Sequence, residues 1–337
     1  MGLAPASAGA SPFFHVMASD AGSARRVSSV DALLLLLVLI WGINYSLLKR
    51  VFQVMDPMAF NALRFGLAST VLLTGIAAAR RLARAGRPVD RVFLTAERLT
   101  TRDRFDLIWL GVVGHCVYQW CFSGGLPRTS VSSSALIMAT TPIIVSTASA
   151  LVGHERLRPL HWLGIAVSLT GVVSVVSAGA SHAGDSLAGN ALMSAAAVCW
   201  AVFTLGGNRL MMRHSPLYVS GVTTAVGTSV YILAAVPAIR SIDWSMVTPG
   251  IWGAVAFSGL LSIAASYLIW YAAIQRIGPA RTSIYANMVP VAAMGIATVW
   301  LREPLSLRKI IGAAAVLSGV VLTRLARPAP AVVPSEE

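Results

Sequence analysis

A stripe of aromatic and polar residues marks one face of the first apolar segment. Its members are Trp41, Asn44, Tyr45 and Leu48. The spacing i, i+3, i+4, i+7 brings such side chains onto one face of a helix. Indole, phenol and carboxamide groups combine apolar surface with a few hydrogen-bonding atoms. This face therefore suits a small amphipathic solute, whereas a face turned to lipid should be aliphatic.

Three further apolar segments carry faces of the same kind. The first is formed by His115, Tyr118, Gln119 and Phe122. Internal repeats of the sequence, described below, supply the other two, which are Trp200, Phe203, Thr204 and Gly207, and Ile263, Ser266, Tyr267 and Trp270. Hydrogen bonding between helices explains any one of these residues equally well. The set as a whole predicts a solute cavity with aromatic walls and few polar groups.

Arg64 stands inside the second apolar segment, residues 58–79. An arginine at the centre of a bilayer costs at least about 2.5 kcal/mol on insertion scales, so its side chain should face protein or water. Two interpretations stay open. Arg64 bonds backbone carbonyls or reaches the outer interface, or it attracts an anion to a cavity or gate. Its counterpart later in the chain is Thr223, so repeat symmetry alone does not require a charge.

Pro142 and Pro290 interrupt two related apolar segments. A proline frees a carbonyl one turn earlier, which either lines a cavity or meets a nearby side chain. Thr140, Thr141 and Asn287 lie close in sequence, and the pattern fits a structural kink as well as a gate. The predicted substrate-binding residues are Trp41, Asn44, Tyr45, Arg64, His115, Tyr118, Gln119, Trp200, Thr204, Ser266, Tyr267, Trp270 and Asn287.

Ionisable residues are scarce in these segments. All 13 Asp and Glu residues fall in tails, loops or segment edges, and we expect Glu155 and Glu303 to pair with neighbouring arginines at helix ends. His115 is the side chain near a segment centre that could titrate near neutral pH. It is either a proton-coupling group or a packed neutral histidine, so transport without ion coupling stays open.

Signatures of catalysis and cofactor binding are absent from the sequence. It contains no G-x4-G-K-[ST] phosphate loop, no HExxH and no GxSxG. The cysteines, Cys116, Cys121 and Cys199, lie in apolar segments without metal-ligand spacing. We therefore predict no catalytic residue, no cofactor and no metal site.

The elements that must position the predicted site are transmembrane helices. The 337-residue chain is 56% hydrophobic and 12% charged, whereas a soluble domain usually has about 25% charged residues. A helix needs about 20 apolar residues to cross the hydrocarbon core. We predict an all-α membrane protein with ten transmembrane helices, at 32–48, 58–79, 107–125, 133–152, 160–178, 187–206, 217–239, 249–272, 282–301 and 306–323.

Positive charge is distributed unevenly between the predicted loops. With the N-terminus inside, cytoplasmic segments carry 18 of the 26 Lys and Arg residues and outer loops carry 7. This bias predicts that both termini are cytoplasmic. The net charge of +13 therefore reflects membrane edges rather than a nucleic-acid partner. Arginine outnumbers lysine 24 to 2, which favours a GC-rich bacterial source and hence the bacterial inner membrane.

The chain repeats itself. Trp41, Arg50 and Pro57 recur 159 residues later as Trp200, Arg209 and Pro216. At a shift of 148, Pro142, Glu155, Gly164 and Gly171 recur as Pro290, Glu303, Gly312 and Gly319. Each copy holds five predicted spans, and an odd number inserts the second copy in the opposite orientation. We expect a disordered cytoplasmic tail at 1–29, five-helix repeats at 30–179 and 185–323, and a cytoplasmic tail at 324–337.

In order and spacing, these residues resemble the EamA-type transporters of the drug/metabolite transporter superfamily. The first span resembles that family in Trp41-Gly42-Ile43-Asn44 with Lys49, and the second in Pro57 with Leu63-Arg64-Phe65. Further resemblance lies in Thr129-Ser130, Pro142, Gly153-His154-Glu155-Arg156-Leu157, Gly164, Gly171, Gly278-Pro279-Ala280-Arg281-Thr282-Ser283, Pro290 and Glu303-Pro304-Leu305. The resemblance covers about residues 30–323.

The resemblance implies two inverted five-helix repeats around a central cavity lined by spans 1, 3, 4, 6, 8 and 9. It also implies export or exchange of small metabolites, amino acids among them. Two places depart from the family pattern. Leu301-Arg302-Glu303 stands where Gly-Glu is usual, and His154 lies between Gly153 and Glu155. Neither departure changes the expected fold, and substrate identity does not transfer from the family.

The expected function is that of a secondary transporter, which moves small metabolites across the inner membrane by alternating access, in export or exchange. A membrane-embedded enzyme is one alternative, but it needs clustered His or acidic residues at one interface. A non-transporting scaffold or sensor is another, against which stand the polar faces in both halves. The expected partners are a small-molecule solute and membrane lipid, with no nucleic acid, and a homodimer stays open.

Overall fold

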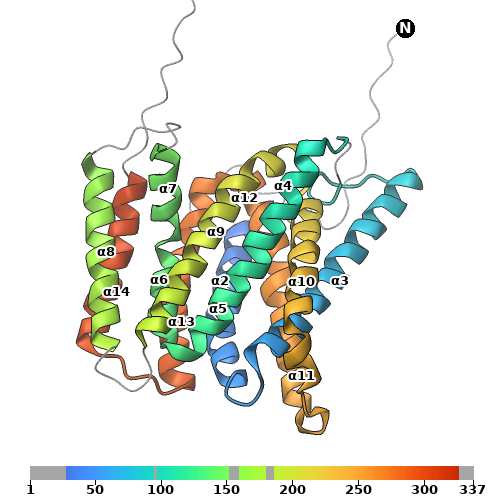
Figure 1. The fold of residues 1–337 in the computed structure, drawn as a ribbon. Coiled ribbons are helices and arrows are strands. Elements are labelled where there is room, and N and C mark those ends of the chain that lie inside the picture. Colours follow the sequence, from blue (N-terminus) through green and yellow to red (C-terminus); the bar gives the residue numbers. More distant parts are fainter. Residues whose placement is uncertain (1–27, 95–96, 152–158, 180–185, 326–337) are drawn as a thin grey trace, which may run out of the picture.

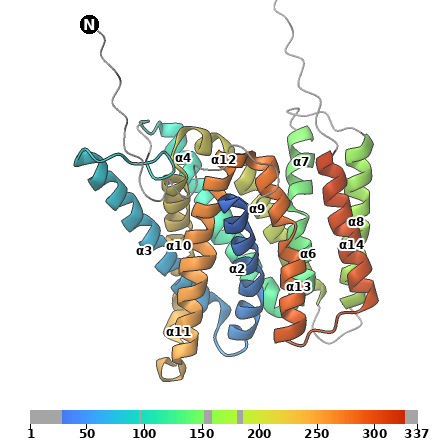
Figure 2. The same ribbon diagram turned by 180° about the vertical axis from the view of Figure 1, so that it is seen from behind.

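The chain folds as a bundle of helices, seen from two sides in Figures 1 and 2. A computed structural model describes residues 28–94, 97–151, 159–179 and 186–325, and every regular element within these ranges is helical. The α-helices are α2 (Ser29–Val51), α3 (Pro57–Arg84), α4 (Thr101–Gly111), α5 (Tyr118–Gly125), α6 (Val131–Ala139), α7 (Thr141–Leu151), α8 (Pro159–Gly179), α9 (Leu187–Arg213), α10 (Pro216–Arg240), α11 (Pro249–Ala256), α12 (Ser266–Ala286), α13 (Val289–Trp300) and α14 (Leu307–Leu325). The π-helical segments are η1 (Val112–Val117) and η4 (Phe257–Ala265), and the 3-10 segments are η2 (Leu126–Arg128) and η3 (Trp244–Met246).

Several of these helices are suited to a lipid environment. The stretches long and apolar enough to cross a membrane are Ser29–Val51, Pro57–Arg84, Leu187–Arg213, Pro216–Arg240 and Pro249–Ala273. Shorter apolar helices are Val131–Val145, Trp162–Ser174 and Val289–Trp300. Large hydrophobic side chains such as Leu39 on α2 and Leu233 on α10 are exposed on the outer surface of the bundle, where lipid would cover them. The chain is a multi-pass integral membrane protein.

Polar capping residues set where some helices begin. Ser28 and Asp31 form a capping box at the start of α2, and Thr100 and Asp103 form another at the start of α4. The predicted spans begin later, at 32 and 107, because they were placed on the apolar runs alone. The predicted tails lie outside the described residues except at 28–29 and 324–325. Of these residues, Ser28 caps α2, Ser29 is its first residue, and 324–325 form the end of α14.

The two proline-containing segments are interrupted as the sequence predicts. A break separates α6 from α7 just before Pro142, and another separates α12 from α13 just before Pro290. Pro142 lacks the N–H that would reach the carbonyl of Met138. The hydroxyl of Thr141 donates to that oxygen instead, at 2.7 Å. The freed carbonyl therefore meets a side chain, which is one of the two outcomes expected from the sequence.

Most helix contacts join the first half of the chain (residues 28–179) to the second half (residues 186–325). Helix α3 packs along α10, α8 along α14, and α2 against α13. Helix α9 packs against α6 and α7 and also meets η1 and α5, while η4 and α12 meet α2. The core is therefore built mainly between the two halves, and side chains at the centre of the bundle come from both.

Helices α8 and α14 touch backbone to backbone through glycines that recur at the shift of 148. A Cβ atom added at Gly171 would lie 2.7 Å from the carbonyl oxygen of Gly312, and one added at Gly319 would lie 2.5 Å from that of Gly164. Small residues allow helices to approach this closely in membranes. This helix pair stands at one side of the bundle in Figure 1 and carries none of the predicted site residues.

Candidate functional site

An aromatic cluster forms where η1, α5, α9 and α12 meet. The Trp200 ring centroid lies 5.3 Å from that of Tyr118, 5.4 Å from that of Phe203 and 6.2 Å from that of Tyr267. The His115 ring lies 4.9 Å from Phe203 and 5.9 Å from Tyr267. Residues from three separately predicted faces thus form one contiguous aromatic cluster, which spans both halves of the chain.

The predicted face of α2 is divided between two neighbours. The Trp41 ring lies 5.7 Å from Trp270, and its Nε1–H donates to the carbonyl of Ser262 at 3.0 Å. That carbonyl belongs to the π-helical segment η4. Tyr45 instead packs on Phe122, with 5.6 Å between ring centroids. Trp41 and Trp270 therefore form a separate pair, whereas Tyr45 reaches α5.

Arg64 is buried at the centre of a polar network, with only 3% of its surface exposed. Its Nε donates to Asn61 Oδ1 at 2.5 Å, Nη1 to Ser258 Oγ at 2.8 Å, and Nη2 to Gln119 Oε1 at 3.1 Å. The Ser258 hydroxyl donates in turn to Asn44 Oδ1 at 2.7 Å. Arg64 thus bonds neutral side chains inside the bundle rather than backbone carbonyls or the outer interface, and both a structural role and the attraction of an anion stay open.

The Arg64 network borders the aromatic cluster through Phe65. The guanidinium carbon of Arg64 lies 5.0 Å from the centre of the Phe65 ring, which lies 6.4 Å from the His115 ring. His115 is buried, with Nε2 3.3 Å from the Thr223 hydroxyl, and its Nδ1 has no hydrogen-bond partner among the described residues. A buried polar atom without a partner costs free energy. The cluster therefore keeps one open hydrogen-bonding position.

Three predicted site residues stand apart from these clusters. The Thr204 hydroxyl donates to the Trp200 carbonyl at 2.7 Å, and the Ser266 hydroxyl donates to the Leu261 carbonyl at 2.8 Å. Both hydroxyls are thus bonded within their own helical segments. Asn287 lies in the turn between α12 and α13. Their roles in substrate binding stay predictions.

The sequence interpretation missed three fully buried members of the Arg64 network. Asn61 donates to Gln119 Oε1 and to the Tyr231 hydroxyl, each at 3.4 Å. Its position one helical turn before Arg64 is a signal that could have identified it. Ser258 lies 194 positions from Arg64, and Tyr231 lies 170 positions from Asn61. No spacing rule links residues that far apart, so only the packing of the helices brings them together.

A second polar group, the Asp103 cluster, joins the start of α4 to the end of α9. The fully buried Asp103 carboxylate lies 3.1 Å from Arg213 Nη1, 3.4 Å from Arg209 Nη2 and 3.3 Å from His214 Nε2. Hydrogen bonding from the Thr100 amide, followed by that from the Thr100 hydroxyl and from His214, holds the pKa of Asp103 well below its usual range. The sequence interpretation found no acidic cluster because these partners lie more than 100 positions apart.

Glu303 caps a helix of the other half. Its Oε1 accepts from the Val131 amide at 2.7 Å, and its Oε2 accepts from the Ser132 hydroxyl at 2.9 Å, both at the start of α6. Arg302 has a φ of 54°, a left-handed conformation that favours glycine and ends α13. The expected pairing of Glu303 with a neighbouring arginine is wrong, because the α6 amides attract its carboxylate instead. Glu155 lies outside the described residues.

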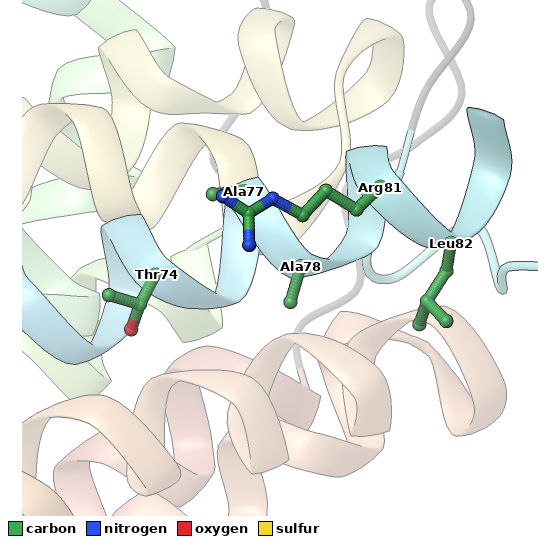
Figure 3. Close-up of a pocket in the computed structure, with 5 residues that line it drawn as sticks. All are labelled: Thr74, Ala77, Ala78, Arg81 and Leu82. Atoms are coloured by element: carbon green, nitrogen blue, oxygen red, sulfur yellow. The ribbon is translucent and has the colours of Figure 1, made fainter. Parts of the chain in front are cut away.

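A surface groove near the end of α3 does not belong to either cluster. It measures about 410 Å³ and is lined by Thr74, Ala77, Ala78, Arg81 and Leu82, all from one helix, as Figure 3 shows. A groove lined by one helix offers no converging polar groups. Elsewhere in the described part of the chain, no group of three or more His, Cys, Asp or Glu residues could hold a metal ion.

Membrane helices that converge on buried aromatic and polar side chains are an arrangement suited to moving a small solute. A family model described as the EamA-like transporter family matches residues 28–177 and again residues 187–325, and the chain belongs to that family. The family is described as one of transporters. The earlier resemblance is therefore confirmed, and transport is favoured over a membrane-embedded enzyme.

Similar proteins carry transporter names. YyaM of Bacillus subtilis, an uncharacterized transporter, is 26% identical over 83% of this chain and 88% of its own. A probable terminal-alkyne amino-acid exporter of Streptantibioticus cattleyicolor is 26% identical over 78% of this chain and 88% of its own. A probable amino-acid metabolite efflux pump of Salmonella typhimurium is 25% identical over 86% and 93%. A crystal structure of another protein, 23% identical, shares the fold with a TM-score of 0.61 over 89% of this chain and 98% of that chain.

Proposed function

We propose that this transporter exports small amphipathic metabolites, amino acids or related compounds among them, across a bacterial inner membrane. The observation that carries the proposal is the aromatic cluster around Trp200, which lies between the two halves and borders the Arg64 network. Aromatic walls with a few placed polar groups suit a small amphipathic ligand. Relatives named as an amino-acid exporter and an amino-acid metabolite efflux pump support the solute class and the direction.

The proposal includes ten spans in two inverted five-helix repeats. In support, the family model matches the chain twice, and the described chain begins and ends at the same end of the bundle in Figures 1 and 2. The sequence repeat also relates helix contacts to each other. When each helix is replaced by its counterpart in the other half, one contact becomes another. The contact of α2 with α13 corresponds to that of α9 with α7, and the contact of α2 with α12 corresponds to that of α9 with α5. Such exchange is what an inverted repeat requires.

The positions of the polar contacts support alternating access as part of the proposal. The positive-inside bias favours a cytoplasmic location for both termini and for the Asp103 cluster. The Glu303 cap then lies at the outer side, because α13 ends at the end of the bundle opposite to the start of α2 (Figure 2). The aromatic cluster stands between these two contacts, each of which joins the first half to the second. Opening one end while the other stays closed would expose the cluster to one side at a time.

The test compares metabolites exported by cells that overexpress the protein with those exported by cells lacking it. Trp200→Ala removes the centre of the aromatic cluster, whereas Trp162→Ala removes an exposed indole from α8, far from the cluster. We expect wild type and Trp162→Ala to enrich the same amphipathic solutes in the medium, and Trp200→Ala to lose that enrichment at equal protein level. No enrichment by the wild type would contradict export, and full activity of Trp200→Ala would remove the cluster from the pathway.

A further inference from the structure

We propose that Arg64 binds the carboxylate of the transported solute, an inference that rests on the proposed export function. The starting observation is a buried cation without an anionic partner. The ion pairs of Asp103, Asp106 and Glu97 with neighbouring Arg and His side chains do not include Arg64. The three groups that accept from Arg64 are an amide oxygen of Asn61, a hydroxyl of Ser258 and an amide oxygen of Gln119, all neutral.

A cation in this position gains most from an anion. Burying an unpaired charge is expensive, and neutral hydrogen bonds offset only part of the cost. The attraction between opposite charges is also stronger in the interior of a protein than in water. Arginines inside membrane proteins are accordingly associated with ion and substrate pathways. The uncompensated charge of Arg64 therefore selects an anionic group that can reach it.

The hydrogen-bond inventory leaves room for that anion. A guanidinium has five N–H donors, one on Nε and two on each terminal nitrogen. The contacts of Arg64 use Nε and one donor on each terminal nitrogen. One donor on Nη1 and one on Nη2 therefore remain without an acceptor among the described residues. A carboxylate offers two oxygens and accepts from both terminal nitrogens of an arginine.

The fold itself does not require a charge at this position. The repeat counterpart of Arg64 is the neutral Thr223, which lies 3.3 Å from His115 Nε2. The neighbours of Arg64 are also bonded to each other. Asn61 donates to Gln119, and Ser258 has its own acceptor in α2. Asn61 Oδ1 and Ser258 Oγ do accept from Arg64, but what these neutral acceptors need is an N–H donor rather than a charge.

The surroundings of Arg64 define the rest of the solute. The Phe65 ring under the guanidinium leads to the aromatic cluster, which offers apolar surface for a small body. His115 Nδ1, buried and without a partner among the described residues, supplies one more polar contact at the edge of that cluster. The solute class that fits is a carboxylate on a small apolar body, as in an apolar amino acid. Compounds with the same apolar part but an amine or an amide in place of the carboxylate lack the group that Arg64 would bind.

The test uses proteoliposomes of purified full-length protein loaded with phenylalanine or with phenylalaninamide, which differ only at the carboxylate. Efflux is corrected for leakage from protein-free liposomes. We expect wild type to release phenylalanine at least about tenfold faster than the amide, the size of effect expected for a charge-assisted hydrogen bond. Arg64→Gln should bring the two rates within about twofold, and Arg64→Lys should retain part of the preference because it keeps the charge.

Binding in detergent keeps the inference testable if Arg64→Gln does not fold. The unfolding temperature of the wild type should then rise with phenylalanine and stay unchanged with phenylalaninamide. An equal rise with sodium chloride alone would identify an inorganic-anion site and overturn the assignment to the solute. Equal efflux of acid and amide by the wild type would overturn the inference while the export proposal stands. Release of neither compound above protein-free liposomes would count against export of this solute class as well.

Discussion

Two buried polar clusters in this protein use arginine in opposite ways. At the end of α9, the side chains of Arg209 and Arg213 are 38% and 33% exposed and meet the carboxylate of Asp103. Inside the bundle, Arg64 is 3% exposed and meets neutral acceptors. Charge is thus neutralised by fixed partners where helix ends meet, and left unneutralised where a solute would pass. Hydrogen bonding to neutral groups can thus position a cation without cancelling its charge.

Removing the carboxylate of the Asp103 cluster should have the largest effect on stability. Asp103→Leu leaves Arg213 and His214 without their common acceptor, and breaking a buried ion pair from one side costs about 3 kcal/mol or more. The measurement is the free energy of unfolding in detergent. Asp106→Asn is the matched control, because Asp106 also meets Arg209 at 3.2 Å but is 18% exposed, and we expect a loss of less than about 1 kcal/mol. Equal effects would contradict the assignment of Asp103 as the centre of the cluster.

The pH dependence of stability separates the effect of the Asp103 charge from the effect of its packing. The pKa of Asp103 is lowered in the folded protein, so its carboxylate adds stability that is complete above the unfolded value of about 3.9 and is lost as pH falls through the folded value. The stability gap between wild type and Asp103→Asn should therefore shrink as pH falls below about pH 4. Unfolding midpoints measured from pH 7 to 3 check this, and a gap that does not shrink in acid would mean that packing causes it.

Glu303 is an intermediate case, a carboxylate neutralised by a helix start instead of by an arginine. Glu303→Gln keeps the shape but weakens the bonds to the amide of Val131 and the hydroxyl of Ser132, and we expect a loss of about 1–2 kcal/mol. Glu97→Gln is the control, since Glu97 is 53% exposed and pairs with Arg213 in solvent. Chemical unfolding of both variants in detergent gives the comparison. A larger loss for Glu97→Gln would show that surface pairs outweigh the cap.

Arg302 should give a smaller effect of opposite sign. Its φ of 54° is unfavourable for a residue with a Cβ atom, so Arg302→Gly should raise the free energy of unfolding by about 1 kcal/mol. Arg308→Gly, within the first turn of α14, should lower it, because glycine weakens a helix. The two variants remove the same side chain, so a gain for both or a loss for both would show that charge rather than backbone conformation controls stability here.

Arg64 should show a smaller effect on stability than Asp103, although it is the most deeply buried of these arginines. Arg64→Met replaces an unpaired charge by an apolar side chain of similar length, which removes the cost of burying that charge. The exchange also takes the donor away from Asn61 Oδ1, and a buried acceptor without a donor costs about 1–3 kcal/mol, so we expect a net loss below that of Asp103→Leu. A loss as large as that of Asp103→Leu, measured under identical detergent conditions, would assign Arg64 to the fold rather than to solute binding.

The elements and much of the aromatic cluster could be predicted from the sequence. Long apolar runs require membrane helices, and helical spacing fixes which residues share a face. Tyr118, Trp200 and Tyr267 were predicted on three separate faces, and the structure brings their rings together. The repeat was needed for this result, because it transferred the pattern of one span to another.

The partners across helices could not be predicted in the same way. Ser258 reaches Arg64, and Asp103 reaches Arg213, only through the rotation and depth at which their helices pack. A single sequence specifies which faces are polar but not which of them meet. Glu303 illustrates the resulting error, since its sequence neighbours are arginines while its true contacts lie at the start of α6.

The π-helical segments η1 and η4 bear on the history of the chain. They end at Val117 and Ala265, which are 148 positions apart, the shift that relates the two halves. A π turn accommodates one residue more than an α turn, as happens when a residue is inserted into a helix that stays helical. If the two halves arose by duplication, as the proposed repeats require, the matching position would place that insertion before the duplication. Deleting one residue at the start of η1 should rotate the residues on one side of the deletion by about 100° relative to those on the other side.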